Sequence, residues 1–249
     1  MLKKERQAYI LHQLNLHNKV LSMDMCKEIA VSEDTVRRDL QELSDAGRLI
    51  KVHGGALSMA FNEVRPEPRN VYSQSQKKII ATKALQLLKE GMFILTSGGT
   101  TILEMIRAIP PQLKLTIVSG SIPVINACLS HPNLDIVVIG DRLSKDSKIT
   151  VGAEAIQKIN SINADLCFLG TNAIDIEHGV TDSDWEVVQV KKAMVNASSK
   201  IICVTIAEKL ETYQTIKICG LDKIDFLVTE CDATDNKLKP FKSFGINVL

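Results

Sequence analysis

Residues 31–56 read VSEDTVRRDLQELSDAGRLIKVHGGA, and this stretch predicts a helix followed directly by a short β-hairpin. Ser32 stands where a helix N-cap is wanted, two acidic residues follow it, and Gly47 supplies a stop. Residues 49–53 then alternate apolar and polar side chains as a half-buried strand does, and Gly54-Gly55 permits a tight turn. The chain should therefore fold back on itself directly after the helix.

The predicted helix has one apolar and one polar face. Val36, Leu40 and Leu43 recur at helical spacing and should face a core. The opposite face suits DNA, because adjacent guanidiniums anchor phosphates and bind guanine edges with two hydrogen bonds. A solvated helix surface is the plain alternative for an isolated arginine pair, and the hairpin beside it favours DNA. The residues predicted to contact DNA are Ser32, Asp34, Thr35, Arg37, Arg38, Gln41, Lys51, His53, Gly54 and Gly55.

This stretch closely resembles the N-terminal signature of the DeoR family of bacterial sugar-metabolism repressors. The family has an S-x-x-T-[IV]-R-R-D-L helix and an R-x-H-G-G-A wing, and this chain reads SEDTVRRDL and KVHGGA. The resemblance implies a winged helix-turn-helix that binds a double-stranded DNA operator. Lys51 replaces the usual arginine, so it keeps a phosphate contact but lacks the planar guanidinium, and its insertion into the minor groove should be weaker.

The order of elements before this stretch agrees with a winged helix-turn-helix. Apolar spacing predicts a helix over 5–16 and a second helix capped by Ser22, with a short strand at 19–21 between them. We assign residues 1–58 to this DNA-binding domain. Residues 59–75 hold two prolines, mixed charge and no periodicity, which predicts a linker. Residues 76–249 then form an effector-sensing and oligomerisation domain.

Length and composition fit a soluble protein of two domains. The chain has 249 residues, of which 45% are hydrophobic and 24% charged, and no apolar run approaches the roughly 20 residues of a membrane span. Its charged N-terminus lacks the apolar stretch of a signal peptide, so we expect it in the cytoplasm. The six cysteines are scattered singly without a C-x-x-C motif. We therefore expect free thiols, no metal site and no cofactor.

The second domain alternates short apolar strands with helices. Strands are predicted at 93–95, 115–118, 135–139, 166–169, 201–205 and 226–229, with helices between most of them. This alternation indicates an α/β fold with a parallel sheet covered on both faces. After Glu230 the pattern is difficult to interpret, although residues 244–248 could add an edge strand.

Small polar loops follow several of these strands, at the edge where an open parallel sheet binds ligands. Backbone amides and hydroxyls in such loops could surround an anion such as phosphate at a helix N-terminus. A Gly-Ser turn that only caps a helix would look the same. The candidate residues in these loops are Thr96, Ser97, Gly98, Gly99, Thr100, Thr101, Ser119, Gly120, Ser121, Gly140 and Gly152.

Residues 170–184, GTNAIDIEHGVTDSD, add side chains able to hydrogen-bond sugar hydroxyls. Asn172, Asp175, Gly179 and Asp182 join the candidate effector site. For Asp182 the favoured role is to cap the helix that follows. His178 is interpreted as a loop residue, because no partner with metal-binding spacing accompanies it.

The resemblance to the DeoR family extends over this domain. The family's sensor domain is similar to ribose-phosphate isomerases and usually answers to a phosphorylated sugar. Three departures stand out: Thr96 replaces the aspartate of a D-S-G-T-T loop, Ser119-Gly120-Ser121 replaces T-N-S, and Ile206 replaces the aspartate of a D-x-x-K motif. That last motif retains Lys209, which the resemblance adds to the effector site.

These departures count against catalysis. Isomerisation of a sugar phosphate needs a carboxylate base and a cation that stabilises the enediolate, and two expected acidic positions hold Thr96 and Ile206. We expect a transcription regulator, most simply a repressor of carbohydrate uptake or catabolism genes, and at least a dimer because two-fold operators need two reading heads. The alternatives are a sugar-phosphate isomerase-like enzyme with an accessory DNA-binding domain, and a regulator that answers to a protein partner instead of a metabolite.

Overall fold

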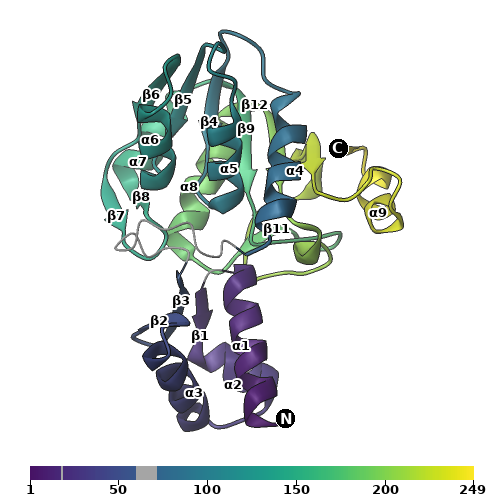
Figure 1. The fold of residues 1–249 in the computed structure, drawn as a ribbon. Coiled ribbons are helices and arrows are strands. Elements are labelled where there is room, and N and C mark those ends of the chain that lie inside the picture. The colour runs from purple at the N-terminus through teal and green to yellow at the C-terminus, as the bar shows by residue number, and fades with distance from the viewer. Residues whose placement is uncertain (18, 60–71) are drawn as a thin grey trace. The chain divides into compact units, whose positions relative to one another are not determined.

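The computed structural model describes residues 1–17, 19–59 and 72–249, and the chain divides into two compact units, Met1–Tyr72 and Ser73–Leu249. Figure 1 shows the fold of both units. Most of the predicted linker, residues 60–71, lies outside the described residues. Helix α4 (Gln74–Leu85) begins inside the range that we predicted as linker.

The N-terminal unit is built from helices and one small sheet. Its elements are α1 (Lys3–His17), β1 (Lys19–Leu21), α2 (Ser22–Ile29), α3 (Glu33–Asp45), β2 (Leu49–Val52) and β3 (Gly55–Ser58). The strands pair antiparallel in the order β1-β3-β2. Ile10, Leu14, Val36 and Leu40 lie at the centre of its core with at most 1% of their surfaces exposed. The predicted winged helix-turn-helix order is confirmed.

Helix α3 begins and ends where its sequence indicates. Ser32 is the N-cap, and its Oγ accepts a hydrogen bond of 3.3 Å from the amide of Thr35. After the helix, Gly47 adopts a positive φ of 66° and donates to the carbonyl of Ser44. A glycine suits this left-handed position because other residues are strained there.

One buried ion pair joins α1 to α3. Asp39 is 1% exposed, and its carboxylate accepts hydrogen bonds from two nitrogens of the Arg6 guanidinium. Asp39 follows Arg37 and Arg38 in the sequence but faces the opposite way, toward α1. Because a buried carboxylate without a partner is costly, this pair fixes which face of α3 turns inward.

The described part of the C-terminal unit centres on one sheet of seven parallel strands. Their order is β15-β14-β12-β9-β4-β5-β6, and neighbouring strands pair in parallel throughout. The strands are β4 (Phe93–Thr96), β5 (Leu115–Ser119), β6 (Leu134–Val138), β9 (Ala164–Gly170), β12 (Ser198–Val204), β14 (Phe226–Val228) and β15 (Asn247–Val248). The predicted parallel α/β fold and the C-terminal edge strand are confirmed.

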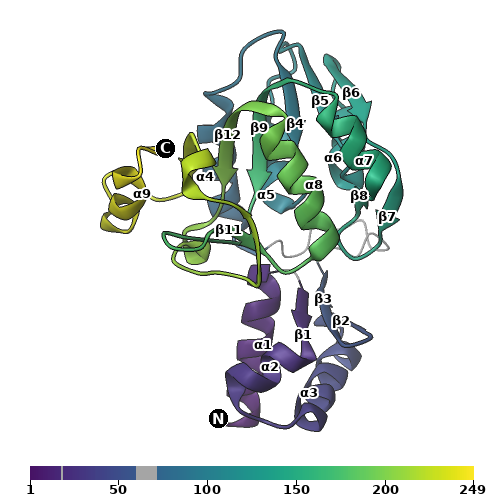
Figure 2. The ribbon, with the colours of Figure 1, turned by 180° about the vertical axis from the view of Figure 1, so that it is seen from behind.

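Helices cover both faces of this sheet. Figure 1 shows α4, α5 (Thr100–Ala108) and α6 (Ile122–Leu129) on one face, and Figure 2 shows α7 (Ala153–Asn160) and α8 (Trp185–Asn196) on the other. The chain passes from the edge strand β6 back to β9 beside β4, so the helices change face at this point. The neighbouring strands β4 and β9 therefore flank a topological switch point, where sheets of this kind bind ligands.

The sequence patterns missed several smaller elements around the main sheet. Strands β7 (Arg142–Ser144) and β8 (Ile149–Val151) form a hairpin, and β10 (Ala173–Asp175), β11 (Gly179–Asp182) and β13 (Ile216–Cys219) form a separate antiparallel sheet. Short helices η2 (Ala207–Lys209), η3 (Leu221–Lys223), η4 (Asn236–Leu238) and α9 (Lys239–Ser243) complete the unit. Within the described residues, no helix combines the length and apolar character needed to cross a membrane.

Candidate nucleic-acid interface and ligand cleft

The polar face of α3 is open to solvent. Asp34, Arg37, Arg38 and Gln41 are exposed, whereas Thr35 is half-buried. Arg38 forms an ion pair of 2.8 Å with Asp34, and both side chains are more than two-thirds exposed. An ion pair this exposed is worth less than about 1 kcal/mol, so a phosphate oxygen could replace the Asp34 carboxylate.

The wing lies beside this face of α3. Lys51 of β2 donates from Nζ to Gln41 Oε1 at 2.8 Å, and Gln41 donates in turn to Asp45 at 2.7 Å. Lys51 and the turn residues His53 and Gly54 are exposed. Helix and wing therefore form one surface with several cations, the arrangement needed to follow a DNA groove and its phosphates.

The two wing glycines have different roles. Gly54 adopts a positive φ of 77° in the turn, with open space around its α-carbon. Gly55 is buried, and a Cβ there would overlap the backbone carbonyl of Val20 on the neighbouring part of the sheet. Gly55 thus allows β1 and β3 to pair closely, and its predicted role as a DNA contact gives way to a structural one.

In the C-terminal unit, the serine hydroxyls predicted to hold an anion instead bind the backbone at neighbouring strand ends. Ser97 Oγ accepts a hydrogen bond of 2.8 Å from the amide of Gly170. Ser119 Oγ donates to the carbonyl of Thr96 and accepts from the amide of Ser121, both at 3.1 Å. All four of Thr96, Ser97, Ser119 and Ser121 are at most 4% exposed. These serines consequently hold the ends of β4, β5 and β9 together.

The N-terminus of α5 remains available for an anion. Gly99 occupies its N-cap position with a positive φ of 114°, and no side chain caps the helix. Thr100 and Thr101 follow in the first turn and are partly exposed. Since first-turn amides lack partners within a helix, this end can donate to a negatively charged group.

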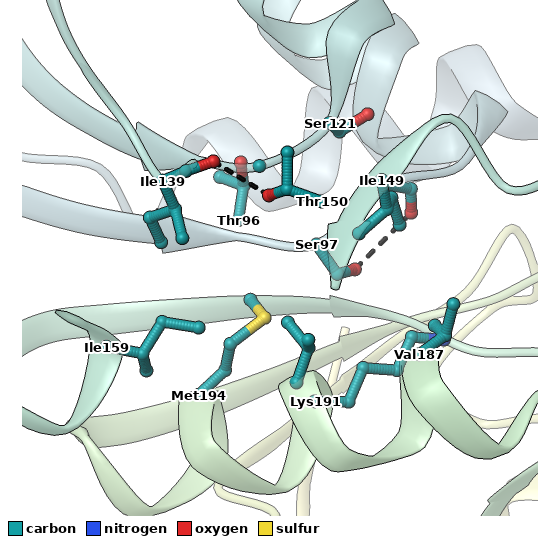
Figure 3. Close-up of a pocket in the computed structure, with 13 residues that line it drawn as sticks. Thr96, Ser97, Ser121, Ile139, Ile149, Thr150, Ile159, Val187, Lys191 and Met194 are labelled. Atoms are coloured by element: carbon teal, nitrogen blue, oxygen red, sulfur yellow. Dashed lines mark hydrogen bonds between the residues drawn. The ribbon is translucent and has the colours of Figure 1, made fainter. Parts of the chain in front are cut away.

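A pocket lies between these loops and helix α8. Figure 3 shows Val187, Lys191 and Met194 on α8 facing a wall that includes Thr96 and Thr150. The remaining lining residues are Ser97, Gly98, Gly120, Ser121, Ile139, Ile149, Ile159 and Val190. Thr96 Oγ1 is buried and has no hydrogen-bond partner within the described residues. A ligand hydroxyl could therefore bind Thr96, while the rest of the pocket is largely apolar.

A buried polar network borders the pocket. Lys191 is 5% exposed and donates from Nζ to Asp182 at 2.7 Å and to the carbonyl of Gly170 at 2.9 Å. Asn172 donates to the other Asp182 oxygen at 2.7 Å. Burial raises the pKa of Asp182, but Lys191 and these hydrogen bonds outweigh it and hold the pKa below its ordinary value. Asp182 is thus an ionised partner of Lys191.

The structure corrects the predicted capping role of Asp182. The N-cap of α8 is Asp184, whose carboxylate accepts from the amides of Glu186 and Val187 at 3.1 and 3.2 Å. Asp182 and Asp184 both precede α8, and the backbone geometry decides which of the two caps the helix. Asp182 belongs to strand β11 and points inward.

Two further lysines reach the same end of the sheet. Lys209 of η2 donates from Nζ to the carbonyl of Thr171, just beyond β9, at 3.0 Å. Its stem is partly exposed but its ammonium is desolvated, and this burial, with the charges of Lys77 and Lys191, lowers its pKa to about 7. Burial also lowers the pKa of Lys77 to about 8, although Glu104 and Glu208 oppose the shift. Lys77 and Lys191 therefore lie close enough to Lys209 for their charges to act on it, and of the three only Lys191 lines the pocket.

Three predicted effector residues shape turns and helix ends, and a fourth lies outside the pocket. Gly152, with a positive φ of 124°, is the N-cap of α7, where the amide of Glu154 donates to Asp141. Asp175 accepts hydrogen bonds from Glu177 and His178 in the β10–β11 turn, which Gly179 closes with a positive φ of 76°. Gly140 is exposed and does not line the pocket. The predicted role of His178 as a turn residue is confirmed.

Lys77 and Lys191 are candidate functional residues that the sequence patterns do not place among the predicted site residues. Lys77 shares the buried face of α4 with Ile80, Ala81 and Ala84, and Lys191 lies within the apolar run of α8. A lysine at a core-facing helical position was the available signal, because lysine is almost never fully buried without a partner. The described cysteines are all free thiols, and no described cluster of His, Cys, Asp or Glu is arranged to hold a metal ion.

Comparisons with known proteins cover nearly the whole chain. A family model for the DeoR C terminal sensor domain matches residues 73–231, and one for the DeoR-like helix-turn-helix domain matches residues 6–60. The chain is 28% identical to the HTH-type transcriptional regulator GlpR of Haloferax volcanii, over 100% of this chain and 98% of that protein. It is 25% identical to a putative aga operon transcriptional repressor of Escherichia coli O157:H7, over 98% of this chain and 93% of that protein.

The chain also has a weak likeness to solved structures. Ribose 5-phosphate isomerase A from Methanocaldococcus jannaschii superposes with a TM-score of 0.42 at 15% identity, over 56% of this chain and 55% of that chain.

Proposed function

Because the chain belongs to the DeoR family of transcriptional regulators, we propose that it represses carbohydrate uptake or catabolism genes and that a phosphorylated sugar controls it. Helix α3 and the wing would hold operator DNA, with Arg37 and Arg38 in the major groove and Lys51 on the backbone. The sugar phosphate would bind the C-terminal cleft and shift the population between arrangements that do and do not bind DNA.

The convergence of Lys77, Lys191 and Lys209 supports an anionic effector. The charges of Lys77 and Lys191 both lower the pKa of Lys209, so each of them repels the Lys209 ammonium. A phosphate bound at the nearby N-terminus of α5 would offset this repulsion and favour the charged forms of Lys209 and Lys77. The sugar hydroxyls would face the Thr96 hydroxyl and the Asn172 amide.

The test is thermal unfolding of the full chain against a panel of sugar phosphates and their unphosphorylated counterparts. A ligand at about 100 times its Kd should add about 2.7 kcal/mol to the free energy of unfolding. We expect a shift only with phosphorylated members, and the same compound should change the affinity for operator DNA measured by fluorescence anisotropy. An equal shift with the unphosphorylated partner would contradict a phosphate-binding cleft.

A sugar-phosphate isomerase is the rival proposal, and the chemistry of the cleft opposes it. Thr96 and Ile206 occupy positions where a catalytic carboxylate was expected, and Asp182 is ion-paired to Lys191. Because the pKa of Asp182 is held low, its carboxylate is a weak base. We expect no aldose–ketose turnover of any compound that shifts the melting temperature. Catalytic turnover by the purified protein would overturn this assignment.

Binding to a two-fold operator further requires two DNA-binding domains. We propose that C-terminal units of two or four copies associate to provide them. Analytical ultracentrifugation of the purified chain at micromolar concentration tests this proposal. A monomer that still binds a two-fold operator through a single DNA-binding domain would contradict it.

A further inference from the structure

The short helix that carries Lys209 has no cap of its own. Ile206 occupies the N-cap position of η2, and an isoleucine side chain cannot accept a hydrogen bond. The carboxylate of Glu230, beyond the end of β14, takes this place instead: the amide of Ala207 donates to its two oxygens at 2.9 and 3.1 Å. The hydroxyl of Thr229 also donates to Glu230, at 2.9 Å.

Glu230 lies in a segment that is itself firmly held. The amide of Thr229 donates to the carbonyl of Leu249, and Thr229 is fully buried. Lys83 of α4 donates to the carbonyls of Thr229 and Cys231 at 2.9 and 2.6 Å, so the segment is attached to the helix that also carries Lys77. Glu230 is therefore a fixed anchor to which η2 attaches.

The anchored turn sets the position of the Lys209 ammonium. One turn of η2 separates Ala207 from Lys209, and the amide of Lys209 donates to the carbonyl of Ile206 at 3.0 Å. From there the Lys209 side chain reaches the carbonyl of Thr171 at the end of β9. Movement of the Ala207 amide would carry the lysine away from this carbonyl.

We infer that Glu230 is a positioning residue for Lys209, supplying from the segment after β14 the carboxylate that position 206 lacks. The inference rests on the proposed function only in that the cleft binds an anion. Loss of the charged acceptor should free η2 and let the Lys209 ammonium move into water. The pKa of Lys209 should then rise toward the ordinary value of about 10.4.

The direction of this change separates positioning from a simple charge effect. If Glu230 acted on Lys209 only through its negative charge, removing that charge would make the ammonium less favourable and lower the lysine pKa further. If Glu230 acts by holding η2, removing it rehydrates the ammonium and raises the pKa. The two mechanisms therefore predict opposite signs.

The experiment titrates Lys209 in the ligand-free full chain by pH-dependent acetylation with acetic anhydride, followed by peptide mass spectrometry. We expect a higher midpoint for Glu230→Ala than for the native chain. The double variant Ile206→Asp/Glu230→Ala, which places a cap carboxylate on η2 itself, should return the midpoint toward the native value. Asp232→Ala is the matched control, because the Asp232 carboxylate accepts from Thr234 and not from η2.

A second readout measures binding of inorganic phosphate by isothermal titration calorimetry. Glu230→Ala should bind phosphate about tenfold more weakly, and the double variant should recover most of this loss. Should Glu230→Ala fail to fold, Glu230→Gln and Ile206→Asp/Glu230→Gln provide the same comparison with a side chain of native shape. A native midpoint in the single variants, or no recovery in the double variants, would overturn the inference.

The two readouts separate this inference from the proposed function. If Lys209 titrates as expected but phosphate and the sugar phosphates do not bind the native chain, positioning stands and the effector proposal fails. If they bind the native chain and Glu230→Ala equally, with an unchanged Lys209 midpoint, the effector proposal stands and positioning fails.

Discussion

The two units place their charged groups in opposite environments. On α3 and the wing, Arg37, Arg38 and Lys51 are exposed and take part in at most weak surface interactions. In the C-terminal cleft, Lys77 and Lys191 are at least 93% buried, and Lys191 has a buried counter-ion in Asp182. An exposed cation can bind a large anionic partner with little loss of solvation free energy. A buried cation is already desolvated and is suited to a small ligand that enters its site. Substitution of a buried charge should therefore lower stability, whereas substitution of an exposed cation should mainly lower DNA affinity.

The largest effect should come from breaking the buried pair. Asp182→Asn leaves the Lys191 ammonium without its counter-ion, and we expect a loss of about 3–5 kcal/mol in the free energy of unfolding. Urea denaturation at pH 7, followed by circular dichroism, measures this loss. Glu186→Gln is the matched control, because the Arg142–Glu186 pair in the same unit is exposed and its loss should change the free energy of unfolding far less. Equal losses in the free energy of unfolding for both variants would show that the buried ion pair stabilises the unit no more than the exposed one.

A smaller effect should follow from removing an exposed arginine of α3. Arg38→Ala should weaken operator binding by about 1–3 kcal/mol, because a guanidinium contributes this much at a base edge. The free energy of unfolding should change by less than about 0.5 kcal/mol, since Arg38 is exposed. Fluorescence anisotropy with labelled DNA and urea denaturation measure the two quantities, with the exposed Lys217→Ala of the other unit as control. An unchanged DNA affinity would exclude Arg38 from the interface.

The cleft should also respond to pH in a way that the DNA surface does not. The pKa values of Lys209 and Lys77 are lowered to about 7 and about 8, so both lose charge as pH rises through this window. An anion prefers the protonated lysines, so its binding is strongest below these values and is lost as pH rises. We expect sugar phosphate affinity to fall about tenfold between pH 7 and pH 9. Isothermal titration calorimetry at several pH values measures this change. In Lys209→Met the affinity for the sugar phosphate should depend less on pH. A fall in affinity as large as that of the native chain would exclude Lys209 as its cause.

The smallest effect concerns Asp34. Asp34→Ala removes an exposed partner of Arg38, and the free energy of unfolding should change by less than about 1 kcal/mol. Operator affinity should rise about twofold, because a negative charge leaves the DNA-facing surface and Arg38 is released. Anisotropy measurements decide the outcome. A fall in affinity would instead show that the Asp34 carboxylate accepts a hydrogen bond from a base.

Local patterns were sufficient to predict the winged helix-turn-helix and the parallel sheet. The Ser32 cap, the Gly47 stop and the spacing of Val36 and Leu40 depend on residues within one or two helical turns. Short apolar strands likewise revealed the sheet. The β10, β11 and β13 sheet escaped notice because its strands are short and its pairing joins residues 180 and 219 across intervening elements.

The cleft was only partly predictable because its chemistry depends on long-range contacts. The glycine-rich loops lie at strand ends as predicted, but the Ser97 and Ser119 hydroxyls bind the backbone of neighbouring strands. Lys191 and Glu230 gain their roles only when distant strands come together. No pattern in the sequence shows that a carboxylate after β14 caps the turn that follows β12.

The Arg6–Asp39 ion pair affects the electrostatic attraction between DNA and the N-terminal unit. Asp39 is 1% exposed and paired with α1, so its charge is hidden from the polar face of α3. Counterions released from DNA reflect the cations that reach phosphates, so the salt dependence of binding should follow Arg37, Arg38 and Lys51. The dependence should be steeper than the formal charge of +1 for the whole chain suggests. A protein with almost no net charge would thus behave toward DNA as a polycation.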